Sequence, residues 1–349
     1  MILILRILAF ILGTLLVLFT LFSAIRTLVL PRAIQDRITS FTFAAVRGVL
    51  KIPMRWSDNF HYRDRVMAYY APIALLTLLP VWLLLVTIGY TGMYWGLGVG
   101  GWYEAFLLSG SSLLTLGFAS AANFIQLSLV YSEATIGLLL IALLIAYLPS
   151  IYAAFQRRES AVSLLEVRAG DPPSAVEMLL RFNRIHGLTQ LHETWQSWEN
   201  WFVELQESHT SLSMLVFFRS PQPKHSWITA SGAVLDAAAL TISTLDISHD
   251  FQADLCLRAG YLALRHIADF FNVPYNPNPH AGDPISITRQ EFDQAYDQLA
   301  SQDLPLKPNR DQAWRDYAGW RVNYDQVLLA LADLTMAPAA PWSSDRSMQ

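Results

Sequence analysis

Residues 66–156 contain no lysine and no arginine, and this limits what the chain can fold into more than any other feature. Two long apolar segments in this window, Met67–Tyr90 and Leu127–Phe155, flank a shorter one, Trp102–Ser120. A third long apolar segment, Ile2–Leu30, lies at the start of the chain. Each long segment exceeds the roughly 20 apolar residues that a helix needs to cross the hydrocarbon core. The sequence therefore predicts an α-helical membrane protein with three transmembrane helices.

The overall composition agrees with a membrane protein attached to a soluble domain. The chain is 53% hydrophobic and 15% charged, whereas soluble proteins carry about 25% charged residues. The shortage of charge is confined to the part before Arg157. A net charge of −4 is too small in magnitude to suggest a nucleic-acid partner. The single cysteine, Cys256, excludes an internal disulfide framework and a cysteine-rich metal site.

Basic residues set the expected topology, because cytoplasmic loops are enriched in them. The stretch from Arg26 to Arg65 contains eight lysines and arginines, counting both ends, and Arg157 and Arg158 follow the third span. Both flanks are therefore expected in the cytoplasm, which places the N-terminus outside and the C-terminal domain in the cytoplasm. The expected location is the cell inner (plasma) membrane. The segment Trp102–Ser120 then has to enter and leave on the outer side, as a re-entrant loop does. A signal peptide is the weaker alternative for the first span, because its apolar core is too long.

The chain divides into five predicted parts. A helix with a capping box, Thr288 to Glu291, is typical of the soluble part, and only Ser211–Phe218 and Trp227–Ala230 resemble strands. The segment Phe41–Trp56 is either an interfacial helix under the inner leaflet or an ordinary linker helix. The predicted parts are transmembrane helix 1 (1–30), a basic cytoplasmic linker (31–65), a pore module (66–158), a mainly α-helical cytosolic domain (159–337) and a disordered tail (338–349).

The segment between the second and third spans carries the chemistry. Trp102–Leu114 can form a short helix whose last turn is rich in hydroxyl groups, and Thr115–Phe118 can continue extended. Gly117 allows backbone torsions that other residues avoid, so that a carbonyl group can turn toward an axis. Four such segments around one axis would present rings of oxygen atoms that replace the water shell of a cation. This arrangement predicts a passive cation channel.

At these residues the chain resembles the pore module of potassium channels, in which two spans flank a pore helix and a T-V-G-Y-G selectivity filter. The resemblance covers roughly residues 66–158 and implies a homotetramer in the lipid bilayer with potassium as the permeant ion and no other cofactor. The implied filter residues are Thr115, Leu116, Gly117, Phe118 and Ala119. Ala119 and Ser120 stand where the family has glycine and aspartate, and this departure bears on potassium selectivity more than on cation conduction.

Further residues are candidates for roles around such a pore. Ser111 and Ser112 would support the filter from the pore helix. Glu133 is a candidate for the outer mouth, or marks the start of the third span near water. Gly137 is either a hinge of the inner helix or a site of close helix packing. Pro149 would form a gate kink or simply end the helix.

The C-terminal half has no pattern that indicates an enzyme. It lacks a G-x-G-x-x-G motif and a Walker loop, and His192-Glu193-Thr194 lacks the second histidine of a zinc-protease helix. The spacing of His186, His192 and His209 does not favour a metal site, so none is predicted. The alternative to a channel is a non-conducting membrane anchor whose cytosolic domain is a scaffold or sensor. The sequence names no cytosolic ligand.

Overall fold

A computed structural model describes residues 1–30, 36–54, 56, 59–185 and 187–346. Within these ranges the chain is built from helices, and its only β feature is a single bridge between Leu245 and Leu306. The chain forms two compact units. The N-terminal unit contains Met1–Ser57 and Ala68–Ala153, and the C-terminal unit contains Asp58–Met67 and Ala154–Gln349.

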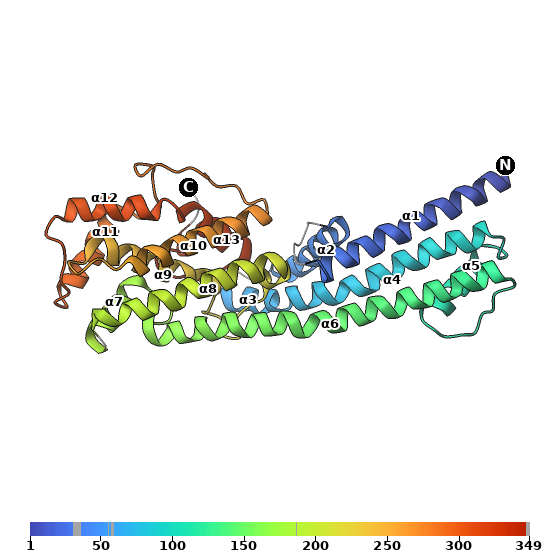
Figure 1. Cartoon of the computed structure of the whole chain (residues 1–349), viewed down its shortest axis with the longest axis horizontal. Coiled ribbons are helices and arrows are strands. Elements are labelled where there is room, and N and C mark those ends of the chain that lie inside the picture. Colours follow the sequence, from blue (N-terminus) through green and yellow to red (C-terminus); the bar gives the residue numbers. More distant parts are fainter. Residues whose placement is uncertain (31–35, 55, 57–58, 186, 347–349) are drawn as a thin grey trace. The chain divides into compact units, whose positions relative to one another are not determined.

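Three helices are long and apolar enough to cross a membrane, which confirms the prediction at this level. They are α1 (Ile2–Leu28), α4 (Tyr70–Gly96) and α6 (Phe124–Ala169). Two shorter helices complete the N-terminal unit, α2 (Arg37–Met54) and α5 (Trp102–Leu113). Figure 1 shows α1 along α4, with α5 beside the end of α4.

Glycine residues let α1 and α4 approach closely. A Cβ atom on Gly13 would lie 2.3 Å from the carbonyl oxygen of Gly89, and one on Gly96 would lie 2.7 Å from the carbonyl oxygen of Arg6. Small residues serve this purpose between membrane helices because the backbones themselves come into contact. A polar contact reinforces this seam, since the Trp82 indole N–H donates to Ser23 Oγ at 3.0 Å.

The segment expected to be an interfacial or linker helix is helical from Phe41 to Met54. It forms most of α2, which packs against α4 and α1 and buries Thr39, Thr42 and Phe43. Asp36 directly precedes this helix, and its carboxylate accepts hydrogen bonds from Thr39 N–H and from Ser23 Oγ. Its position at a membrane surface stays a prediction. The first linker residues, 31–35, lie outside the described part of the chain.

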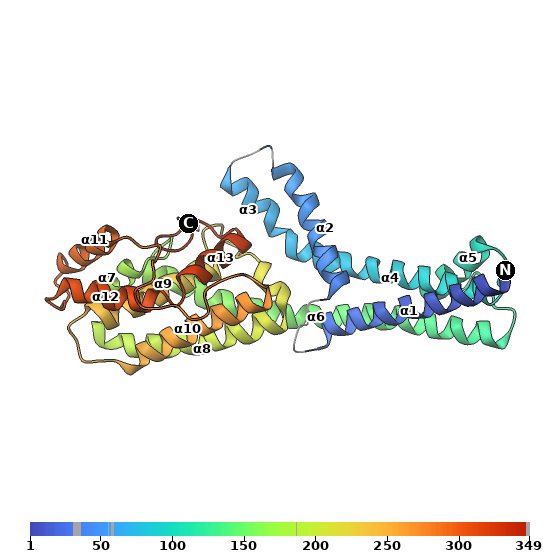
Figure 2. The same ribbon diagram turned by 90° about the horizontal axis from the view of Figure 1, so that it is seen from above.

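The C-terminal unit contains a helical bundle around α9 (Trp227–Thr244). Every residue of α9 except Ile242 is buried, because α7, α10, α12 and α13 pack around it (Figure 2). The remaining elements of the unit are α3 (Phe60–Ala68), the last part of α6, α7 (Ala175–Ile185), η1 (Leu188–Gln190), α8 (Leu191–Ser211), η2 (Ser213–Phe217), α10 (Phe251–Phe270), α11 (Arg289–Ala300), α12 (Arg310–Arg321) and α13 (Asp325–Thr335).

Two expectations for this unit are wrong. The two segments that resembled strands form the short 3₁₀ helix η2 and the start of α9, because their apolar side chains pack into a helical core. The tail expected to be disordered from residue 338 is packed as far as Arg346. Ala340 and Ser343 are buried, and Arg321 donates to the Trp342 carbonyl at 2.7 Å. Residues 347–349 lie outside the described part.

Candidate functional site

The candidate site is α5 together with the segment that follows it. At 12 residues α5 is about 18 Å long, too short to cross a hydrocarbon core of about 30 Å. A tight turn separates it from α4, and the Glu104 carboxylate accepts the Gly101 N–H at 2.8 Å. Trp95 of α4 and Trp102 of α5 stack with ring centroids 4.7 Å apart. The turn therefore directs α5 back along α4.

Contacts farther along α5 show where it ends. Ser109 Oγ lies 3.2 Å from the Thr87 carbonyl oxygen of α4. A Cβ atom on Gly137 would lie 2.5 Å from the Leu113 carbonyl oxygen, so the end of α5 touches α6 there. Gly137 lies about 20 Å along α6 from Phe124, at 1.5 Å per residue. Residues 114–123, the return segment, join the end of α5 to the start of α6 and therefore run back over this distance. The chain thus leaves the end of α4, forms α5 and returns to the same end to begin α6 (Figure 1).

The backbone after α5 turns sharply rather than continuing extended. Leu116 N–H donates to the Ser111 carbonyl at 2.8 Å, and Thr115 N–H donates to the Ser112 carbonyl at 3.0 Å. Thr115 has φ 54°, so these bonds form a Schellman C-cap with Thr115 in the left-handed region. Gly117 has φ 73°. The expected extended run from Thr115 to Phe118 is therefore wrong at its first residue.

The return segment faces outward from the chain. Leu116 and Phe118 are 60% and 61% exposed, and Ala119 is half-buried. Ser111 lies beneath the segment, and its Oγ accepts the Ala119 N–H at 3.1 Å. The hydroxyl of Ser112 instead donates to the Leu108 carbonyl at 2.8 Å. Of the two serines, only Ser111 uses its hydroxyl to hold the candidate filter.

Glu133 lies inside the N-terminal unit and not at an open mouth. Its residue is 0% exposed. Tyr94 of α4 donates to one carboxylate oxygen at 2.9 Å, and Ser109 of α5 donates to the other at 2.5 Å. The outer-mouth expectation fails because both oxygens of Glu133 are held by hydroxyl groups of the same chain. Sequence reasoning did not find Tyr94 as a partner, although a lone acid in an apolar window signals that partners exist.

The two candidate hinge residues have different surroundings. Gly137 is buried where α5 meets α6, which is the close packing that was the alternative to a hinge. Pro149 lies within α6, and the helix continues through it to Ala169. Pro149 therefore does not end the helix, and a role in gating stays a prediction.

A buried polar network in the C-terminal unit is centred on Asp236. Arg321 donates to both carboxylate oxygens of Asp236 at 2.7 Å, and Tyr317 and Tyr324 donate to the same carboxylate at 3.0 and 2.8 Å. Each partner of this network is satisfied, so it holds α9, α12 and α13 together rather than offering a reactive group.

Among the described residues, no group of three histidine, cysteine, aspartate or glutamate side chains is placed to hold a metal ion. His192 pairs with Asp250 at 2.9 Å, and His186 lies outside the described residues. His209 is fully buried, with Arg158 Nη1 3.4 Å from its Nε2. Burial lowers the pKa of His209 well below its usual value, and the nearby positive charge of Arg158 lowers it further.

Comparison with known protein families, curated proteins and solved structures gives no match to this chain.

Proposed function

We propose that this chain is one subunit of a homotetrameric channel that conducts cations passively, with potassium as the leading ion. One observation carries the proposal. The segment after α5 has irregular backbone and exposed side chains at Leu116 and Phe118, about 20 Å along α6 from its first residue. In a membrane, irregular backbone occurs only where protein buries it or where it lines water. A single chain leaves this segment uncovered. Further copies around a water-filled axis would provide the protein contacts and the water that the segment needs.

The chemistry of the segment favours a cation. Its oxygen atoms are those of carbonyl groups and the Thr115 hydroxyl, and rings of such oxygens replace the hydration shell of a cation. Residues 66–156 carry no positive side chain that would repel one. Thr115, Leu116, Gly117, Phe118 and Ala119 would form the filter, and Ser111 would hold it through Ala119. We place the protein in the cell inner membrane, with the C-terminal unit in the cytoplasm.

The test is cation flux through the purified full chain in liposomes, with potassium and sodium gradients measured in parallel. The variant Gly117→Val should abolish flux, because valine strains a backbone at φ 73°. The matched control is Gly110→Ala in α5, where an added Cβ atom meets no other atom within 4 Å of it in the chain. This control should conduct like the wild type.

Two outcomes would contradict the proposal. Folded tetramers whose flux is the same with and without Gly117→Val would exclude this segment as the filter. A protein that is monomeric or dimeric in native mass measurements and passes no ions would favour the alternative, a membrane-anchored scaffold or sensor.

A further inference from the structure

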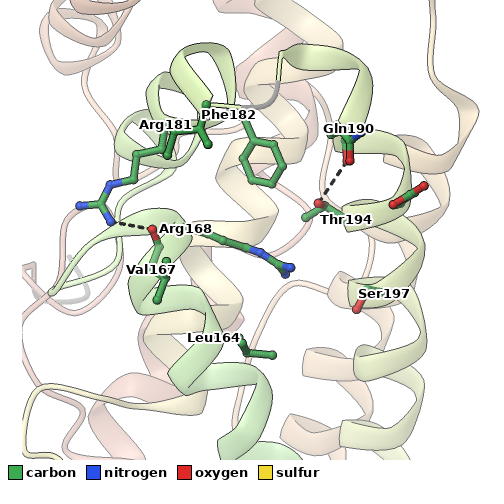
Figure 3. A pocket seen from close by; sticks show the side chains of 10 residues that line it. Leu164, Val167, Arg168, Arg181, Phe182, Gln190, Thr194 and Ser197 are labelled. Carbon is green, nitrogen blue, oxygen red and sulfur yellow. Dashed lines mark hydrogen bonds between the residues drawn. The ribbon is translucent and has the colours of Figure 1, made fainter.

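A cavity of about 470 Å³ lies in the C-terminal unit, where the last turns of α6 meet α7, η1 and α8. This volume falls in the range of roughly 300–1,000 Å³ typical of small-molecule sites. Figure 3 shows the Arg168 side chain extending from α6 into the space that faces α8, with Phe182 of α7 on the same space. All the lining residues belong to the one unit.

One wall of the cavity is apolar and accessible. Leu164, Val167 and Ile185 are each more than half exposed, and the buried ring of Phe182 completes the wall. Apolar side chains gathered around a cavity gain free energy when an apolar group covers them. The cavity therefore has room and driving force for a hydrocarbon or aromatic group.

Two charged side chains at the cavity have no partner among the described residues, Arg168 and Glu193. The other charged lining residue, Arg181, is engaged: it donates to Glu177 at 2.6 Å and to the Val167 carbonyl at 2.7 Å. No ion pair joins Arg168 to Glu193 in the described part of the chain, so each is open to a charged group of opposite sign. A ligand with one charge would leave one of them facing a like charge or no partner.

The facing helix adds neutral hydrogen-bonding groups. Thr194 donates to the Gln190 carbonyl at 3.3 Å, so its oxygen is left to accept. Ser197 lies one turn farther along α8 and lines the same cavity (Figure 3). The Thr194 oxygen can accept a hydrogen bond from an ammonium group, and the Ser197 hydroxyl can accept one or donate one to a carboxylate.

We propose that this cavity binds an α-amino acid with an apolar side chain. The carboxylate would pair with Arg168, the ammonium group with Glu193, and the side chain would cover Leu164, Phe182 and Ile185. This ligand class uses both unpaired charges and the apolar wall together. An organic anion or an amine alone would use only one of the charges.

One side of the cavity is formed by α6, the helix that also carries Gly137, because Leu164, Val167 and Arg168 belong to α6. Arg181 already fastens α7 to the end of α6 through the Glu166 and Val167 carbonyls. A bound amino acid would add contacts between α6, α7 and α8. An effect of the ligand on ion flux rests on the proposed function, whereas its binding does not.

The experiment is isothermal titration calorimetry on the purified full chain in detergent. The probes are L-leucine, L-phenylalanine and L-tryptophan. 3-Phenylpropionate lacks the ammonium group of phenylalanine, and 2-phenylethylamine lacks its carboxylate. We expect phenylalanine to bind at least about tenfold more tightly than either analogue, since each charge-assisted hydrogen bond contributes at least this factor.

Four variants locate the site. Arg168→Gln should weaken phenylalanine and 3-phenylpropionate about tenfold and leave 2-phenylethylamine unchanged. Glu193→Gln should weaken phenylalanine and 2-phenylethylamine and leave 3-phenylpropionate unchanged. Arg184→Gln on α7 and Glu204→Gln on α8 remove exposed charges that do not line the cavity, and both should bind like the wild type.

Three results would overturn the proposal: no binding of any of the three amino acids at millimolar concentration, equal binding of phenylalanine and its analogues, or equal affinities in all four variants. Ion flux in the same preparation separates the two proposals. A chain that binds phenylalanine and conducts no ions would contradict the channel and support this site. A chain that conducts ions and does not bind phenylalanine would contradict this site and support the channel.

Discussion

At Glu133 two hydroxyl groups from different helices converge on one carboxylate. Tyr94 of α4 and Ser109 of α5 donate to it, so a single side chain of α6 joins three helices. An isolated polar group inside an apolar bundle is costly unless its hydrogen bonds are made, and here both oxygens are used. Glu133 therefore positions α5, the helix that carries the candidate filter.

Replacing Glu133 tests this role. Glu133→Leu should lower the free energy of unfolding by about 1–3 kcal/mol, because the Tyr94 hydroxyl loses its acceptor. Glu133→Gln should cost less, since a hydroxyl can turn to accept from an amide. Thermal unfolding in detergent measures both. Equal melting temperatures for the two variants would show that the hydrogen bonds do not decide the stability.

The sequence alone predicts interactions between residues that are close along the chain, and it does not predict contacts between residues that are far apart along it. The capping box of Thr288 and Glu291 is present as predicted, because its partners are three residues apart. The pairing of Asp236 with Arg321 joins residues 85 positions apart, and no local pattern announces it. The left-handed torsion at Thr115 was also missed, since β-branched residues disfavour it and the C-cap overrides that preference.

At the scale of elements, apolar length predicted the three long helices, but not where they end. The third helix runs to Ala169, beyond the expected Phe155, because its last turns bury Val162, Leu165 and Ala169 in the C-terminal unit. Pro149 did not stop it. The resemblance of Ser211–Phe218 to a strand failed because packing outweighs the strand preference of apolar and aromatic residues.

The seam between α1 and α4 makes its own prediction. Gly13→Ala places a Cβ atom 2.3 Å from the Gly89 carbonyl oxygen, which is backbone and has to move. We expect a loss of about 1–3 kcal/mol in stability, the usual cost of overpacking. Gly48→Ala is the control, because an added Cβ atom there meets nothing within 4 Å. A melting temperature in detergent that falls equally in both variants would refute the seam.

At the scale of the whole molecule, α6 contributes to both units, and the C-terminal unit stands on a core of its own. Within that core, His209 contacts Arg158 and the ring of Trp227. Arg158 forms an ion pair with Glu159, in which Nη2 of Arg158 lies 2.7 Å from Oε1 of Glu159. A proton on His209 would add a second positive charge in a fully buried place, so the folded state keeps this histidine neutral.

The stability of the C-terminal unit should therefore depend on pH. The unfolded chain binds a proton at His209 as the pH falls through about 6.5, whereas the folded state does not. Below that pH the free energy of unfolding should fall by up to about 1.4 kcal/mol per pH unit from this group. Denaturant unfolding followed by tryptophan fluorescence between pH 7.5 and 5 measures the slope. His209→Gln should flatten it; an unchanged slope would assign the effect elsewhere.

The glycine seam sets hydropathy and geometry against each other. A hydropathy scale treats leucine at positions 13 and 89 as an improvement, because each replacement makes a membrane span more apolar. The distances leave no volume for even one methyl group at either position. Any redesign or ranking of variants that scores these spans by hydropathy alone will therefore favour the substitutions that force the two helices apart.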